Sequence, residues 1–87
     1  MKIYNRFNLP PHIKRHSESM SWGYGGSGPS DLALSLLSDV IGIDNATYYS
    51  AYQTFKFDFV SKFNDDWKIS EEEIREWYNN FKKELKI

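Results

Sequence analysis

Four of the six residues from Gly23 to Gly28 are glycine, and Pro29 follows them directly. Glycine tolerates positive φ angles and very close backbone approach, so this segment is expected to turn sharply. Proline suits the first position of a helix, where its missing N–H costs nothing. The sequence therefore predicts a tight corner that leads into a helix.

Three helices are predicted, at residues 29–41, 45–63 and 70–85. The first carries Asp31 in its first turn, stops at Gly42 and has one apolar face, which consists of Leu32, Leu36, Leu37 and Val40. The second repeats aromatic side chains at steps of three and four residues, where most helices use leucine: Tyr48, Tyr52, Phe55, Phe59 and Phe63. The third opens with a capping box of Ser70 and Glu73 and ends in a basic stretch, Lys82 to Lys86. Its apolar face consists of Ile74, Trp77, Tyr78, Phe81 and Leu85.

The N-terminal part of the chain favours short strands. Residues 1–9 alternate loosely between polar and apolar side chains until Pro10 and Pro11 end any regular element. Residues 20–22 form a second candidate strand, which we expect to pair with the first. The predicted fold class is therefore α+β, with a small N-terminal β element of two short strands packed with three helices. A chain of 87 residues forms a single domain, residues 1–87.

Composition excludes several classes of protein. The chain has no cysteine, so it holds no disulfide, thiolate nucleophile or cysteine-ligated zinc. Its longest apolar-rich run, residues 32–43, is too short to cross a membrane, and no apolar signal segment follows Met1. We therefore expect a cytoplasmic protein. A net charge of −1 argues against direct binding to nucleic acid.

The glycine-rich turn is open to two interpretations. Free N–H groups at the start of a helix can hold a phosphate, here at Gly25 to Gly28, with a base stacked on Trp22 or Tyr24. The segment lacks the Lys-Ser/Thr pair of a nucleoside-triphosphate loop, however, and no βαβ pattern surrounds it. The favoured interpretation is a structural corner, in which Trp22 and Tyr24 pack against the first helix.

No catalytic or metal-binding set is recognisable. His12 and His16 are four residues apart, but the preceding prolines disfavour a helix there, and Glu18 is the only nearby carboxylate. Several serines lie near His16 without the order or the sharp turn of a hydrolase. We therefore predict that the chain is not an enzyme and has no cofactor, no metal and no catalytic residues.

Acidic side chains gather between residues 58 and 76. The acidic side chains of residues 71–73 have a structural explanation, because they lie at the N-terminus of the third predicted helix, where the helix dipole favours negative charge. The remaining excess, Asp65, Asp66 and Glu76, resembles the charge that a phosphate backbone presents to a basic groove. In the second predicted helix, Tyr49 and Phe57 do not lie on the aromatic stripe, so a self-association face that contains them remains an alternative.

Two segments resemble a family of small uncharacterised proteins from bacteria, phages and mobile elements. They are His16-Ser17 and the run from Trp22 to Leu34, which carries a WGYGGSGP motif into a Leu/Ala-rich helix. The likeness continues through YQTFKFDFV and the Trp67 to Trp77 region, so it covers about residues 16–78. The chain departs from the family in its brief N-terminal region and in Met20, where an aromatic is usual. The resemblance implies a shared fold and transfers no catalytic residue.

Phages encode many small one-domain proteins that block host defence by binding an effector. With that context, the leading hypothesis is a phage- or prophage-derived inhibitor of a bacterial defence system, an anti-CRISPR protein that binds a Cas effector stoichiometrically. The expected contact surface consists of Tyr24, Gly25, Gly26, Ser27, Asp65, Asp66 and Glu76, with the acids opposing the partner's Lys and Arg. The alternative is a small module that binds a nucleotide or phosphate at the glycine-rich turn.

Overall fold

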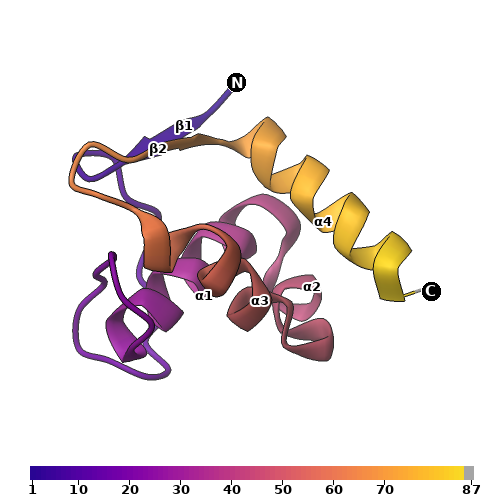
Figure 1. Cartoon of the computed structure of the whole chain (residues 1–87), viewed down its shortest axis with the longest axis horizontal. Coiled ribbons are helices and arrows are strands. Elements are labelled where there is room, and N and C mark those ends of the chain that lie inside the picture. Colours follow the sequence, from indigo (N-terminus) through magenta and orange to yellow (C-terminus); the bar gives the residue numbers. More distant parts are fainter. Residues whose placement is uncertain (86–87) are drawn as a thin grey trace.

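The structure is a computed structural model that describes residues 1–85 of the 87-residue chain. Its elements in chain order are β1 (Ile3–Asn5), α1 (Ser27–Ile41), α2 (Ile43–Thr47), the 3-10 turn η1 (Tyr48–Ser50), α3 (Ala51–Asp58), the 3-10 turn η2 (Val60–Lys62), β2 (Lys68–Ser70) and α4 (Glu71–Leu85). Figure 1 shows α1 in the middle of the molecule and α4 leading away from the small sheet. A two-stranded antiparallel sheet packed with helices confirms the predicted α+β class.

The sheet joins two segments that lie far apart in the sequence. Strand β1 pairs with β2, so that Tyr4 lies opposite Ile69 and both side chains are buried. The first strand was predicted correctly, but its partner was not, because residues 20–22 form no strand. Strand signals of three residues are too short to specify a partner, and burial of Ile69 against the core decided the pairing.

Helix α1 is surrounded by protein on almost every side. All ten residues from 28 to 37 are buried, including the predicted face of Leu32, Leu36 and Leu37. The helix begins at Ser27, two residues before the predicted start, so Asp31 lies just beyond the first turn. It ends at Ile41, where Gly42 has a φ of +87° as the predicted stop requires.

The continuous helix predicted at 45–63 is wrong. The chain forms α2 and α3 there, separated by η1, in which Tyr49 and Ser50 both have left-handed φ angles. A straight helix of that length would run about 28 Å, beyond the roughly 22 Å of α1. By turning at η1, the chain keeps both α2 and α3 against α1. Tyr52 and Phe55 of the aromatic stripe are buried, whereas Tyr48 is exposed.

Helix α4 confirms its prediction. Ser70 Oγ accepts a hydrogen bond from the Glu73 backbone N–H at 3.1 Å, and Glu73 accepts one in return from the Ser70 N–H at 3.1 Å. Three residues of the predicted face are fully buried (Ile74, Tyr78 and Phe81). The far end of the predicted basic stretch, Lys86, lies outside the described residues. Within residues 1–85, none of the helices has both the length and the apolar character that a membrane crossing requires.

Candidate partner-binding surface

The glycine-rich turn is a closely packed corner. Gly23 has a φ of +88°, and its N–H donates to the Val60 carbonyl at 3.1 Å. A methyl group on Gly26 would overlap the ring of Tyr24, and one on Gly28 would overlap the hydroxyl of Ser21. A larger residue at either position would force the side chain of Tyr24 or Ser21 to move, because these side chains fill the space beside the helix start. This packing supports the structural interpretation of the turn.

A buried lysine fastens the same turn to α3. Lys56 is only 5% exposed, and its ammonium donates to the Gly25 carbonyl at 3.2 Å and to Ser30 Oγ at 3.0 Å. No described carboxylate forms an ion pair with it, and burial lowers its pKa from the ordinary value. Lys56 thus holds the turn against α3, and the side chains of Tyr24 and of Phe57, which lies next to Gly25, remain exposed.

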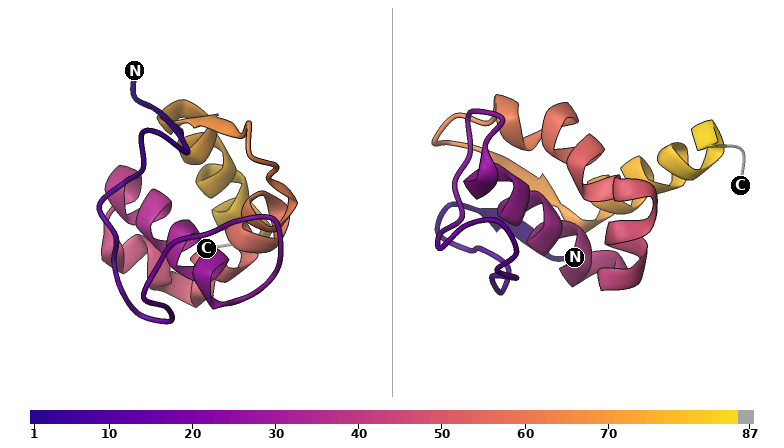
Figure 2. Two further views of the ribbon diagram at one scale, coloured as in Figure 1. Left: turned by 90° about the vertical axis from the view of Figure 1, so that its left-hand side faces the viewer. Right: turned by 90° about the horizontal axis from the view of Figure 1, so that it is seen from below.

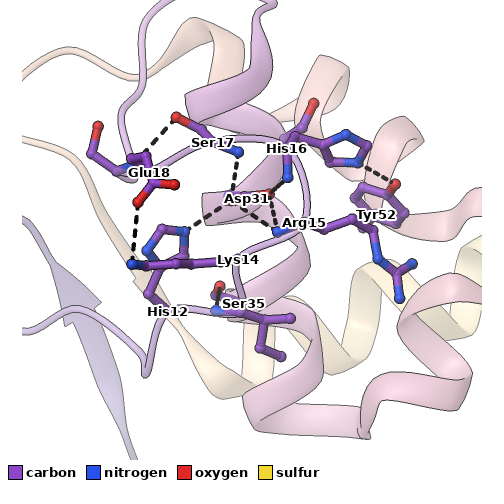
Figure 3. Close-up of polar contacts among 12 residues, drawn as sticks. His12, Lys14, Arg15, His16, Ser17, Glu18, Asp31, Ser35 and Tyr52 are labelled. Atoms are coloured by element: carbon purple, nitrogen blue, oxygen red, sulfur yellow. Dashed lines mark hydrogen bonds and ion pairs between the residues drawn. The ribbon is translucent and has the colours of Figure 1, made fainter.

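The segment before the turn wraps around the carboxylate of Asp31, a contact that the sequence did not predict (Figure 3). Asp31 is fully buried in α1 and accepts the backbone N–H groups of His16 at 2.9 Å and Ser17 at 3.1 Å. The N–H of Arg15 lies 3.3 Å from both carboxylate oxygens, and His12 Nε2 lies 2.8 Å from one of them. Figure 2 shows this segment crossing over α1. The Asp31 carboxylate therefore holds His12 and residues 15–17 on α1, and the Ile13 N–H adds a hydrogen bond to Ser35 Oγ at 2.9 Å.

The two histidines point to different partners. His12 meets Asp31, whereas the ring of His16 stacks on Tyr52 and its Nε2 lies 2.7 Å from the Tyr52 hydroxyl. Among residues 1–85, no three metal-binding side chains come together. His16, Ser17 and Asp31, which carry part of the family resemblance, thus act in this chain to hold the loop on the helices.

Acid is expected to destabilise the protein through Asp31. Burial alone raises the pKa of Asp31, but the hydrogen bonds from His12 and from three backbone N–H groups outweigh it and lower the pKa below 3.8. Because the unfolded carboxyl binds protons at higher pH than the folded one, this contribution is complete above pH 3.8 and is lost as the pH falls through the folded pKa.

Chemical denaturation at a series of pH values measures this effect. The free energy of unfolding of the wild type should fall steeply below the ordinary aspartate pKa, and Asp31→Asn should show a shallower fall. Other carboxyls titrate equally in both proteins, Asp39 included, so the difference between the two curves isolates Asp31. Parallel curves would show that its hydrogen bonds do not favour the charged form.

Trp22 connects the glycine-rich turn to the predicted acids. Its indole Nε1 donates to Asp65 Oδ1 at 3.0 Å, and its ring packs edge-on against Trp67 with centroids 5.7 Å apart. Asp66 is exposed in the same loop, where its N–H donates to Asn64 Oδ1 at 2.8 Å. The structure thus brings Asp65 and Asp66 beside the turn that carries Tyr24.

Glu76 is not brought into this group. It is exposed on α4, beyond β2, and no described hydrogen bond or ion pair joins it to the 65–66 loop. Gly25 and Ser27 are exposed at the turn, whereas Gly26 is half-buried beneath Tyr24. The predicted surface therefore contains one compact part, at the turn and the 65–66 loop, and one separate acid.

Sequence reasoning missed two aromatic side chains of this surface. Phe57 is 56% exposed, and its ring edge lies 3.3 Å from where a side chain on Gly25 would begin. Phe7 is 85% exposed and shares a cavity of about 190 Å³ with Asp65 and Asp66. The sequence offered a signal for Phe57, which falls off the aromatic stripe, but none that placed Phe7 near these acids. The aromatic–acidic surface defined here comprises Phe7, Trp22, Tyr24, Phe57, Asp65 and Asp66.

Comparison with curated proteins gives no match to this chain, and comparison with solved structures gives none either. A family model does match, over residues 4–80. That range includes most of β1, the loop on Asp31, the glycine-rich turn and most of α4. The chain therefore belongs to the family of unknown function DUF6166.

Proposed function

We propose that this chain is a protein-binding module that acts stoichiometrically as an inhibitor of a bacterial defence effector, most specifically a Cas protein that holds nucleic acid in a basic groove. The observation that carries the proposal is the aromatic–acidic surface. Tyr24 and Phe57 are each more than half exposed at the glycine-rich turn, and Trp22 just before the turn bonds Asp65, although a small chain gains stability by burying aromatics. Such exposure is typical of binding surfaces, where aromatic side chains anchor the contact.

The two parts of the surface would have different tasks. The aromatic rings supply apolar contact area, and the turn that presents Tyr24 is held in place by Lys56 and by the corner packing. A rigid surface loses little conformational entropy on binding. The carboxylates of Asp65 and Asp66 would oppose Lys and Arg side chains that otherwise contact phosphates. The choice of a defence effector rests on the resemblance to small proteins of phages and mobile elements.

A tagged pull-down identifies the partner. Lysate of a CRISPR-bearing host with a low-GC genome would be passed over the immobilised protein with and without nuclease treatment, and the retained proteins would be identified by mass spectrometry. A defence subunit retained after nuclease treatment supports the proposal. Retention that disappears with nuclease, or an eluate that contains no retained protein, contradicts protein-directed binding.

Charge reversal tests the acids. The double variant Asp65→Lys/Asp66→Lys is expected to bind the captured effector at least about tenfold more weakly, with a smaller dependence on salt, since two attractive charges become repulsive. Titration by surface plasmon resonance at several salt concentrations measures both quantities. Because Asp65 also accepts a hydrogen bond from Trp22, the single variant Asp66→Lys serves as a second test that leaves this contact intact.

Glu72→Lys/Glu84→Lys is the matched control, because it changes the net charge equally at exposed positions of α4. It should bind nearly as well as the wild type. If both double variants bind the effector equally weakly, the loss of affinity comes from the change in net charge, and Asp65 and Asp66 have no specific role. Glu76→Lys asks separately whether the contact extends onto α4, which the structure gives no reason to expect.

A further inference from the structure

A second site lies on the opposite side of α1, between α4, the end of α1 and α2. A cavity of about 350 Å³ is lined there by Arg75, Tyr78, Asn79 and Lys82 of α4, with Val40 and Asn45 facing them. The four α4 residues follow one another at steps of three, one and three, so they share one face of the helix. Figure 1 shows α4 running past α2 on this side. Small-molecule sites begin at about this volume.

The cavity is positively charged. Arg75 and Lys82 form no ion pair with any described residue, and no carboxylate lines the cavity. On α4 itself, Glu71 and Glu72 lie about one turn before Arg75 and Glu76 follows it directly, but none of these acids is within ion-pair distance of Arg75 or Lys82. Lys82 lies over the ring of Tyr78, 5.1 Å from its centroid. Two uncompensated cations beside an aromatic ring favour an anionic ligand.

Two polar side chains of the cavity, Tyr78 and Asn45, are held in place by hydrogen bonds. The Tyr78 hydroxyl donates to Asn45 Oδ1 at 3.3 Å, and Asn45 Nδ2 donates to the Ile41 carbonyl at 2.8 Å. The side-chain amide of Asn79 makes no hydrogen bond with the described residues, which leaves it free to meet a donor–acceptor pair such as a base edge.

Exposed aromatic side chains stand next to this cavity. Tyr48 follows Asn45 by one turn, and it lies close enough to Tyr78 to add to the rise in the Tyr78 pKa that burial causes. Its ring meets Tyr49 edge-on at 4.6 Å, and both rings are exposed. Tyr49 and Ser50 hold left-handed φ angles without being glycine, a costly conformation that clusters at binding sites. A planar ring could stack here.

We propose that this cavity binds a nucleoside phosphate, with the phosphate between Arg75 and Lys82 and the base against Tyr48 and the amide of Asn79. The ligand is either a free nucleotide or one unit of a single strand, since both present the same chemistry. The site is separate from the glycine-rich turn, and the proposal does not depend on the protein-binding function. A chain with a net charge of −1 thus carries its positive charge locally, on one face of α4.

Titration of the ¹⁵N-labelled protein with AMP tests the proposal by NMR. We expect saturable shifts of backbone amides in 45–49 and 75–82. Ribose 5-phosphate, which lacks the base, should bind at least several-fold more weakly, because it cannot stack. A short oligo(dA) identifies the source: binding about tenfold tighter than AMP and strongly salt-dependent indicates a single strand, and equal binding indicates a free nucleotide.

Variants assign the contacts. Arg75→Ala and Lys82→Ala are each expected to weaken AMP binding about tenfold. Lys83, the exposed neighbour of Lys82 on α4, provides the control, and Lys83→Ala should leave AMP binding unchanged. Asn79→Asp places a negative charge in the cavity without changing side-chain size and should also weaken binding, which keeps the test independent of the arginine and lysine variants. All these positions lie outside the buried core.

Three results would overturn the proposal. They are the absence of shifts with both AMP and oligo(dA), equal affinity for AMP and ribose 5-phosphate, and shifts that persist unchanged in Arg75→Ala/Lys82→Ala. The first would show that the cavity does not take this ligand class. The second would remove the base contact, and the third would place the bound anion elsewhere.

Discussion

Replacing Asp31 with alanine is expected to lower the free energy of unfolding by about 3–5 kcal/mol, a large part of the stability of a domain this size. Three backbone N–H groups and His12 all lose the acceptor that their geometry provides. The N–H groups of residues 15–17 cannot find another partner while they stay in place, and an unpaired buried donor is costly. We therefore expect segment 12–17 to detach from α1.

Urea denaturation followed by tryptophan fluorescence measures the loss, and amide hydrogen exchange locates it. The N–H groups of residues 15–17 should exchange much faster in the variant, while those of α4 change only with global stability. Asp31→Asn keeps one acceptor oxygen and should fall between alanine and the wild type, which protects the test if the alanine variant fails to fold. Glu84→Ala, an exposed carboxylate change, is the control and should shift stability by about 0.5 kcal/mol or less. Equal stability of Asp31→Ala and this control would contradict an anchoring role.

Replacing Phe55 with alanine should cost about 3–5 kcal/mol, because it removes a fully buried ring and leaves a cavity. Phe55 joins α3 to α4: its ring lies edge-on to Trp77 with centroids 5.1 Å apart, and 5.2 Å from Phe59. Loss of this contact is expected to loosen the docking of α4, so the unfolding transition followed by tryptophan fluorescence should come at lower denaturant concentration.

Phe57→Ala, two residues further along α3, is the matched control for Phe55→Ala. It removes an identical side chain that is more than half exposed, and we expect a loss below about 1 kcal/mol. Similar costs at positions 55 and 57 would show that the buried ring contributes no more than a surface ring. A difference in the expected direction would establish that α3 presents one aromatic residue to the core and the next one to the aromatic–acidic surface.

The predicted surface was partly recoverable from the sequence. Asp65 and Asp66 were identified because the helix dipole accounts for the negative charge of residues 71–73 but not for the charge of these two acids. That reasoning also selected Glu76, which shares the charge but not the location. Phe57 was visible only as a departure from the aromatic stripe. The cationic cavity gave no local signal, because Arg75 and Lys82 read as ordinary exposed positions of a helix.

What the sequence by itself determined are features whose cause lies within a few residues. The capping box of Ser70 and Glu73 closes over three residues, Gly42 stops α1 through its own φ angle, and the corner's glycines leave room for nearby side chains. Local hydrogen bonds and steric limits do not depend on the rest of the fold, so they can be predicted from short segments.

Only the tertiary structure decided the rest. The partner of β1, the break of the second helix at Tyr49 and the burial of Asp31 beneath residues 15–17 all depend on side chains far away in the sequence. Strand β1 pairs with β2 because the core can accept Ile69 there. The second predicted helix breaks so that both α2 and α3 pack against α1. The Asp31 carboxylate is buried because enough N–H groups gather around it. Each of these outcomes is a balance of packing and desolvation over the whole molecule.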